Sequence, residues 1–501
     1  MTRSPNKLIP ADFATVPSLV VLDAVEVSVG SPLTHAQAIG IGITTTGPVP
    51  AELGFDREAL TEAGFDGKAG NTLMLPSPTG PDLIAVGLGD PGALTPAALR
   101  DAAAAVAAAA PRRSDIALRV AAPEVERASG IAALVEGALL ARYKYTVLTN
   151  DSKHVNLQRL ALDLGGSPKT DDHNAVNAGI VAARAAAVAR DLANTPPGHL
   201  TATNMADIAA ELGARFGFDV ESYDRQQLIE MGCGGLLGVN QGSIEEPRMI
   251  VLRYHPAGEA TGKLGLIGKG IMYDSGGISL KPSDPMHLLM KMDMGGAAAV
   301  LGAFTGLREL GGTAEVVGWL ACTDNMPSST AYKLGDVLTS RDGTTIEVKN
   351  TDAEGRLVMS DAFGLANEEG VDAIIDIATL TGAALVSLGS STAALLGNDD
   401  RIISAVKAAA AETDEPAWQL PLERKYRKQL DSDIADISNL GGPFAGTITA
   451  ALFLDHFTKG TPWAHLDIAG TMQSDTDDSW RPKGATGYGA RLLLSAAQRF
   501  A

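Results

Sequence analysis

The chain has 501 residues, which is too many for a single hydrophobic core, so two or three domains are expected. It carries 40 basic and 59 acidic residues, and the formal net charge of −19 argues against nucleic acid and anionic membranes as partners. The N-terminus has no apolar segment typical of a secretion signal, and the longest run of small apolar residues, 102–110, is too short to span a bilayer. The two cysteines, Cys233 and Cys322, are therefore expected to be free buried thiols, and the chain to be a cytoplasmic enzyme or a large scaffold protein.

The first part of the chain alternates strand-like and helical segments, which is an α/β pattern. Strand-like runs occupy residues 18–27 (SLVVLDAVEV), 82–89 (DLIAVGLG) and 116–122 (IALRVAA), and helical runs occupy residues 95–110 and 130–145.

The hexapeptide GLGDPG, residues 87–92, has the glycine spacing of a dinucleotide-binding loop and follows a strand-like run. However, the segment about 20 residues further on offers no well-placed acid to bind a ribose. A tight turn from strand to helix is the better interpretation, and a nicotinamide-dependent oxidoreductase is the alternative.

A polar stretch rich in Gly, Asp and Asn, residues 164–179, has the composition of a linker. An alanine-rich helix is expected to follow and to stop at the two prolines after Thr195. We therefore predict an N-terminal α/β domain over residues 1–170, a connecting helix over 171–195, and a larger catalytic α/β domain over 196–501. The larger domain is expected to have a mixed, mostly parallel sheet covered by helices.

Two lysines and two aspartates follow in the second domain. A strand-like run leads into Lys269, and Asp274 comes next in a loop that contains two glycines. Lys281 lies further along, and Asp293 stands just before a helical run, residues 295–307. Taken alone, Asp293 would fit a helix N-cap and the lysines would fit the protein surface.

The octapeptide NTDAEGRL places Asp352, Glu354 and Arg356 at alternate positions. In an extended segment this spacing turns the three side chains to one face, about 6.6 Å apart along the strand. The pattern by itself is common on solvated strand faces. Here it stands between a strand-like run, 344–348, and a helical run, and the apolar segment after that, 371–389, is typical of a strand buried in a parallel sheet. Charged clusters between a strand and a helix are typical of α/β active sites.

Together, Asp274, Asp293, Asp352 and Glu354 bring four negative charges to the strand ends of one sheet. Mutual repulsion would drive these acids to protonate unless cations lie between them, and two divalent cations carry the matching charge. A site rich in carboxylates and poor in histidine suits a pair of Mn²⁺, Mg²⁺ or Zn²⁺ ions rather than a single tetrahedral zinc. Two such ions, roughly 3.5–4 Å apart, can share a water and acidify it into a nucleophile.

These motifs resemble the leucyl aminopeptidase (cytosol aminopeptidase) family. The likeness rests on GKGIMYDSGGISLKP at 268–282, MKMDMGGAAAV at 290–300 and NTDAEGRL at 350–357, of which the last is highly specific to that family. It continues through RDLANTPPGHLTA, SDIADISNLGG, PWAHLDIAG and ATGYGAR, and so covers the chain from residue 190 to its end. The first 170 residues resemble the family's N-terminal domain in outline.

The resemblance implies an exopeptidase that releases N-terminal amino acids, preferably leucine or other apolar residues, by means of a water that bridges two metal ions. The implied ligands of the two Mn²⁺ or Zn²⁺ ions are Lys269, Asp274, Asp293, Asp352 and Glu354. Of these, Asp274 and Glu354 would bridge the ions, and Lys269 would bind as a neutral amine, which requires a strongly lowered pKa.

The resemblance also implies roles outside the ligand set. Lys281 would polarise the peptide carbonyl and stabilise the oxyanion. Arg356 would hold a bicarbonate ion that takes the proton from the attacking water. Met290, Thr379 and Gly382 match family positions that line the pocket for the first side chain.

The resemblance finally implies a cytoplasmic homohexamer that acts on peptides with a free N-terminus.

Two other classes of function stay open. A two-metal phosphoryl hydrolase would use similar carboxylates, although the net charge of −19 argues against polyanionic substrates. A DNA-binding assembly protein is the other, because some relatives in the family are reported to have that second role.

Overall fold

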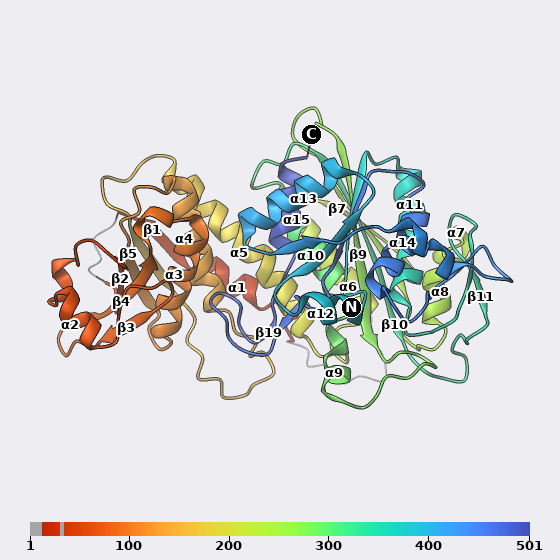
Figure 1. Cartoon of the computed structure of the whole chain (residues 1–501), viewed down its shortest axis with the longest axis horizontal. Coiled ribbons are helices and arrows are strands. Elements are labelled where there is room, and N and C mark those ends of the chain that lie inside the picture. Colours follow the sequence, from red (N-terminus) through yellow and green to blue (C-terminus); the bar gives the residue numbers. More distant parts are fainter. Residues whose placement is uncertain (1–12, 31–34, 501) are drawn as a thin grey trace. The chain divides into compact units, whose positions relative to one another are not determined.

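The computed structural model describes residues 13–30 and 35–500, and these form two compact units (Figure 1). The described residues of Val16–Ala187, with Ser474–Lys483, make up one unit, and those of Met1–Thr15, Val188–Gln473 and Gly484–Ala501 make up the other. Each unit contains a sheet and helices, so the predicted two-domain α/β class is confirmed. Cys233 and Cys322 are free and buried, as predicted.

The smaller unit is built on a six-stranded sheet in the order β1-β6-β5-β2-β4-β3, in which only β3 runs antiparallel to its neighbour. Its strands are β1 (Glu26–Val29), β2 (Ala38–Thr44), β3 (Thr72–Leu75), β4 (Asp82–Gly89), β5 (Asp115–Arg119) and β6 (Arg159–Asp163). Its helices are α1 (Ser18–Asp23), η1 (Ala51–Leu53), α2 (Arg57–Glu62), η2 (Pro91–Ala93), α3 (Pro96–Ala109) and α4 (Arg127–Ala141).

Two predictions for this unit have different outcomes. The strand predicted over 18–27 is wrong in its first half, which forms α1, because a short apolar run does not distinguish a helical turn from a strand. The tight turn predicted for GLGDPG is confirmed. Strand β4 ends at Gly89, whose φ of 83° suits glycine, and the Asp90 side chain accepts from Gly92 N at the start of η2.

The long helix α5 (Asp172–Asn194) covers the segment predicted as a connecting helix and ends before Pro196. Its residues up to Ala187 belong to the smaller unit and those from Val188 to the larger one. The boundaries at 170 and 195 stay a prediction.

The larger unit contains an eight-stranded mixed sheet in the order β15-β14-β17-β13-β9-β10-β8-β7. Strands β17, β13, β9 and β10 are mutually parallel at its centre, and β8, β7 and β14 add antiparallel pairings. Its strands are β7 (Asp219–Tyr223), β8 (Arg248–Tyr254), β9 (Lys263–Asp274), β10 (Glu315–Asn325), β13 (Ala373–Ala378), β14 (Ala393–Gly397), β15 (Ala417–Gln419) and β17 (Trp463–Asp467). Short strands elsewhere are β11 (Val337–Thr339), β12 (Thr345–Glu347), β16 (Ile437–Ser438), β18 (Gln473–Ser474) and β19 (Gly484–Ala485).

Helices cover both faces of this sheet (Figure 1). On one side lie α6 (Ala202–Phe216), α10 (Gly295–Leu307), α13 (Asp400–Thr413) and α15 (Ala490–Gln498), and on the other lie α8 (Gly234–Asn240), α11 (Gly355–Glu369) and α14 (Gly446–Phe457). The remaining helices are α7 (Arg225–Met231), α9 (Pro285–Leu288), η3 (Leu289–Met292), α12 (Gly382–Leu388) and η4 (Arg424–Leu430). One segment of the described chain, Pro285–Leu307, is long and apolar enough to cross a membrane, but 78% of its most apolar window is buried inside the protein, as in a core helix.

The apolar segment predicted as one buried strand, 371–389, divides into two elements. Its first part is β13, which is buried along its whole length between the parallel strands β9 and β17. Its second part is α12, because the Thr381 side chain accepts from Ala384 N and caps a helix there. Since the central strands are parallel, their carboxyl ends meet at one edge of the sheet, where ligands bind in folds of this class.

Candidate metal centre

The candidate centre begins on β9. Lys269 lies within this strand and Asp274 is its last residue, whereas the sequence suggested a strand that stops at Lys269 and a loop that carries Asp274. Strand β9 continues because it stays paired with β10 as far as Asp274. The side chain of Lys269 passes over the first residue of α11, where a Cβ on Gly355 would lie 2.5 Å from Lys269 Cε. Any larger residue at position 355 would clash with the Lys269 side chain, so glycine is needed there for the lysine to reach the carboxylates.

The Lys269 ammonium group is buried among acids. Its Nζ lies 2.9 Å from Asp293 Oδ2 and 2.9 Å from Glu354 Oε1, and it donates to the Thr379 carbonyl oxygen at 2.8 Å. Only 2% of Lys269 is exposed, so these contacts replace the water that its charge would otherwise bind.

Asp293 does not cap α10, so the capping interpretation is wrong. The N-cap position is Met294, and no side chain caps that helix. The carboxylate of Asp293 turns instead towards Lys269, and it accepts a hydrogen bond at Oδ1 from Thr379 Oγ1 at 2.7 Å. Contacts between a charged ammonium group and a carboxylate are stronger than hydrogen bonds to neutral groups, which favours this orientation.

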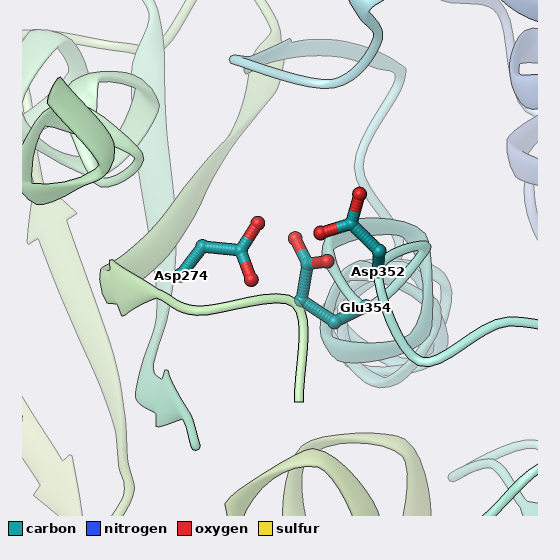
Figure 2. Close-up of side chains that lie close together, drawn as sticks. All are labelled: Asp274, Asp352 and Glu354. Carbon is teal, nitrogen blue, oxygen red and sulfur yellow. The ribbon is translucent and has the colours of Figure 1, made fainter. Parts of the chain in front are cut away.

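Three further carboxylates converge on one point. Oxygen atoms of Asp274, Asp352 and Glu354 lie within 4.8 Å of one another, and Figure 2 shows the three side chains directed towards a common space. Lys281 Nζ lies 2.9 Å from Asp274 Oδ2 and 2.6 Å from Asp352 Oδ1. The far oxygen of Asp274, Oδ1, accepts from Asn325 Nδ2 at 2.8 Å. The structure thus brings the five predicted metal ligands and Lys281 together.

The extended conformation predicted for Asp352, Glu354 and Arg356 is wrong. Glu354 has helical backbone angles (φ −78°, ψ −36°) and stands at the N-cap of α11, while Arg356 lies inside that helix. A carboxylate is favoured at a helix N-terminus by the helix dipole, which explains the early start of α11. Arg356 donates from Nη1 to the Asn439 carbonyl oxygen at 2.9 Å. The positive charge between the acids comes from Lys269 and Lys281.

The acids carry more negative charge than the lysines balance. Burial raises the pKa of the Asp293, Asp352 and Glu354 carboxyl groups, and the neighbouring charge of Asp274 adds to the rise in each case. Burial opposes the charge of Lys269, but the acids around it more than offset this and raise its pKa above the usual value. Four carboxylates and two ammonium groups leave a sum of −2, so further positive charge would stabilise the cluster.

The residues fit divalent cations. Glu354 is 1% exposed, and its Oε2 has no hydrogen-bond partner among residues 13–30 and 35–500. Carboxylate oxygens are the ligands that Mn²⁺ and Mg²⁺ prefer, and Zn²⁺ accepts them as well. A buried, unpartnered carboxylate oxygen within an electron-rich cluster is best satisfied by a cation.

Arg356, at the edge of the centre, has a buried donor without a partner, whereas Glu354 has a buried acceptor without one. It is 5% exposed, and its Nε donor has no acceptor within the described part of the chain. Burial lowers the pKa of its guanidinium group to about 10, which still leaves the group charged at neutral pH. A small anion would satisfy this donor.

A cavity of about 350 Å³ opens beside the carboxylates. The predicted pocket residues Met290, Thr379 and Gly382 all line it. Further lining residues that sequence reasoning missed are Met286, His287, Leu289, Leu385, Ala469 and Met472. They come from three separate segments, 286–289, 385 and 469–472, and share no spacing, so the sequence alone carries no signal that groups them.

Comparisons with known proteins match both parts of the chain. The catalytic domain of the cytosol aminopeptidase family matches residues 187–494, and the N-terminal domain of the same family matches residues 56–152. A probable cytosol aminopeptidase of Geobacter sp. (strain M21) is 41% identical over 494 residues, which cover 95% of this chain and 99% of the relative. One from Synechococcus sp. (strain JA-3-3Ab) is 39% identical over 490 residues, or 92% and 96% of the two chains.

Two solved structures are similar to the whole fold. The bottromycin maturation enzyme BotP in complex with Mn has a TM-score of 0.85 at 38% identity, with 92% of this chain and 99% of that chain covered. A mutant of tomato leucine aminopeptidase has a TM-score of 0.85 at 32% identity, with 95% and 97% covered.

Proposed function

This chain belongs to the cytosol aminopeptidase family and is a metal-dependent aminopeptidase, and from that premise we propose that it uses two divalent ions to release N-terminal leucine and other apolar residues from peptides. The observation that carries the proposal is the convergence of Asp274, Asp293, Asp352 and Glu354 beside a cavity with apolar walls.

In this proposal five side chains hold the two ions, Mn²⁺ or Zn²⁺: Lys269, Asp274, Asp293, Asp352 and Glu354. Asp274 and Glu354 would be shared between the ions. When bound, the ions supply the positive charge that acidifies a water and attracts the amine of the substrate. Lys269 can serve as a ligand only as a neutral amine, and since the surrounding acids raise its pKa, ion binding must displace a proton from it. Ion affinity is therefore expected to fall as the pH falls.

Lys281 and Arg356 act on the substrate and on the attacking water. Lys281 donates to the carbonyl oxygen of the scissile bond and stabilises the oxyanion, a role that its position on the cavity wall supports. Arg356 would hold a bicarbonate ion, which would supply the base for the proton of the attacking water. The buried Nε of Arg356, without an acceptor in the described part of the chain, supports an anion at this position.

The cavity sets the preference for the first residue. Met290, Leu385 and Met472 give it apolar walls, and methionine side chains adapt to several apolar shapes. Thr379 and Gly382 complete the pocket for the first side chain. A cavity that ends in carboxylates attracts an amine and repels a peptide carboxylate, which supports cleavage from the N-terminus.

A panel of aminoacyl anilides tests the proposal. Leucyl and methionyl anilides are expected to be cleaved faster than aspartyl or lysyl anilides, and N-acetyl-leucyl anilide, which lacks the free amine, is expected to be inert. Elemental analysis of the purified protein is expected to give two divalent ions per chain. Equal cleavage of the acetylated substrate, or a single ion at full activity, would contradict the proposal.

We further propose that the protein is a cytoplasmic homohexamer. The name of the curated relatives, probable cytosol aminopeptidase, supports the cytoplasmic location, and the hexamer rests on the resemblance of the motifs to the family. Sedimentation velocity is expected to give a hexamer at micromolar concentration, and a monomer at that concentration would contradict this assembly.

A further inference from the structure

Asn439 is a buried asparagine next to the loop between β12 and α11, which carries Asp352. It belongs to the motif SDIADISNLGG, to which the proposed function gives no role. It follows β16, which pairs in parallel with β12, so that Ser438 lies opposite Glu347. Asn439 itself is fully buried, at 0% exposure. Its backbone N–H donates to the Glu347 carbonyl oxygen at 2.9 Å, which extends the pairing by one residue and fixes where the side chain points.

The side-chain carboxamide of Asn439 forms all its hydrogen bonds with the loop between β12 and α11. Its Oδ1 accepts from Lys349 N at 2.8 Å and from Asn350 N at 3.3 Å. Its Nδ2 donates to the Asn350 carbonyl oxygen at 2.7 Å and to the Ala353 carbonyl oxygen at 3.3 Å. A carboxamide offers two donors and two acceptor positions, so each one has a partner in this loop.

These bonds enclose Asp352, which lies between the two carbonyl groups that Asn439 holds. The Asn350 side chain adds a local bond, because its Oδ1 accepts from Asp352 N at 2.7 Å. The backbone of Asp352 is thus fixed on both sides, and its carboxylate is left to face Asp274 and Glu354 (Figure 2).

The carbonyl oxygen of Asn439 also accepts the bond from Arg356 Nη1 at 2.9 Å. This contact fixes one end of the guanidinium group, while its Nε remains without an acceptor in the described part of the chain. One residue therefore contacts both the loop that carries Asp352 and the side chain of Arg356.

We propose that Asn439 is a positioning residue of the aminopeptidase centre, which holds Asp352 in place for the metal ion and Arg356 in place for its anion. The inference rests on the proposed function, in which Asp352 is a metal ligand and Arg356 holds the base. A positioning residue is needed here because the acids repel one another, and the loop that carries Asp352 has no regular secondary structure to resist that repulsion.

Asparagine is specific for this task. An aspartate would keep the bonds to Lys349 N and Asn350 N but would set a carboxylate oxygen against the carbonyl oxygens of Asn350 and Ala353. Buried polar groups without partners are costly, so the loop is expected to move away from the carboxylate. Outer partners of metal ligands typically change metal affinity by about 10–100-fold when they are mutated.

The test compares Asn439→Asp with Asn367→Asp, a matched change at the C-terminal end of α11. Asn367 makes similar bonds away from the centre. Its Nδ2 donates to the Phe457 carbonyl oxygen at 2.8 Å, and its Oδ1 accepts from Thr461 Oγ1 at 3.1 Å. Mn²⁺ affinity is measured by calorimetric titration of the demetallated proteins, well below their unfolding temperatures. Asn439→Asp is expected to weaken the affinity by about 10–100-fold and to reduce the response of activity to added bicarbonate, while Asn367→Asp lowers only the thermal midpoint.

Asn439→Ser serves if the aspartate variant does not fold, because serine removes the loop bonds without adding a charge. A folded Asn439 variant with wild-type Mn²⁺ affinity and a wild-type bicarbonate response would overturn the inference. Asp352→Asn separates this failure from that of the proposed function. If Asp352→Asn weakens Mn²⁺ binding and the Asn439 variants do not, the positioning role alone is wrong, whereas wild-type affinity in Asp352→Asn removes the ligand assignment on which it rests.

Discussion

The ammonium nitrogen of Lys281 lies 2.6 Å from Oδ1 of Asp352, and both side chains are partly exposed at the mouth of the carboxylate cluster. Lys269 makes the corresponding contacts at the closed end, where it is buried. The two lysines differ in their freedom, because Lys281 can swing on its flexible stem whereas Lys269 is enclosed. This difference fits a ligand role for Lys269 and a role at the reacting carbonyl for Lys281.

Removal of metal is expected to abolish peptidase activity, and Mn²⁺ or Zn²⁺ is expected to restore it. The physical reason is the charge of the cluster, in which four acids face only two lysines. The thermal midpoint should also fall on chelation, since a cation that binds the folded state stabilises it. Anilide hydrolysis and calorimetry before and after dialysis against a chelator check both effects, and full activity in exhaustively demetallated protein would contradict the metal centre.

Asp352→Ala and Glu354→Ala are each expected to lose at least one metal ion without loss of the fold. Glu368→Ala is a suitable control, because Glu368 makes a surface ion pair with Arg341 at 2.9 Å. Such a pair contributes ~1 kcal/mol or less to stability, and its loss should leave the metal content unchanged. Metal content is measured on gel-filtered protein, and wild-type content in both site variants would show that these acids do not hold the metal ions.

A second buried charge pair lies on the central sheet, where His465 Nδ1 is 2.7 Å from Asp376 Oδ1 and both side chains are fully buried. Burial opposes a charge on the imidazole, but Asp376 outweighs it and raises the pKa of His465 above its usual value of 6.5. A raised pKa in the folded state means that the pair contributes its full stability below pH 6.5 and loses it as the pH rises through the folded pKa.

His465→Gln is therefore expected to destabilise the protein most below pH 6.5 and progressively less above it. The measurement is the difference in thermal midpoint between variant and wild type at several pH values, so that groups common to both cancel. His255→Gln, at an exposed histidine, controls for the loss of an imidazole. A difference between His465→Gln and wild type that does not change with pH would show that the pair is not charged.

The convergence of the acids could be predicted from the sequence because it follows from topology. Lys269 and Asp274 lie on a strand with strand-like composition, Asp293 precedes a helix, and parallel central strands bring such segments to one edge. The position of NTDAEGRL between a strand-like and a helical run likewise indicated the same edge for Asp352 and Glu354, where the structure has them.

Local conformation and long-range partners could not be predicted in this way. The alternation in NTDAEGRL suggested a strand, but the helix dipole and the contact with Lys269 favour a helix that has Glu354 at its N-cap. Asn439 and Met472 reach the site from segments far away in the sequence, and their contributions depend on strand pairing and packing that no local pattern encodes.

The last prediction separates the roles of Lys281 and Arg356. Lys281 should act on the developing oxyanion, an interaction that is stronger in the transition state than in the ground state. Lys281→Ala should therefore lower kcat more than it raises KM, with a loss on the order of 10²–10³-fold, as for other oxyanion donors. Its metal content should stay at the wild-type level, since the variant removes a cation that competes for Asp274 and Asp352.

Arg356 should act through the bicarbonate that it holds, so Arg356→Ala removes proton transfer. General bases typically contribute ~10²–10⁴-fold, and a smaller loss is expected where water replaces the ion. The distinguishing measurement is activity after carbonate is stripped and then restored. Wild type and Lys281→Ala should both recover on addition of bicarbonate, each from its own lower level, whereas Arg356→Ala should not respond. A wild-type response in Arg356→Ala would show that the base is held elsewhere, because this variant has no guanidinium group to bind the anion.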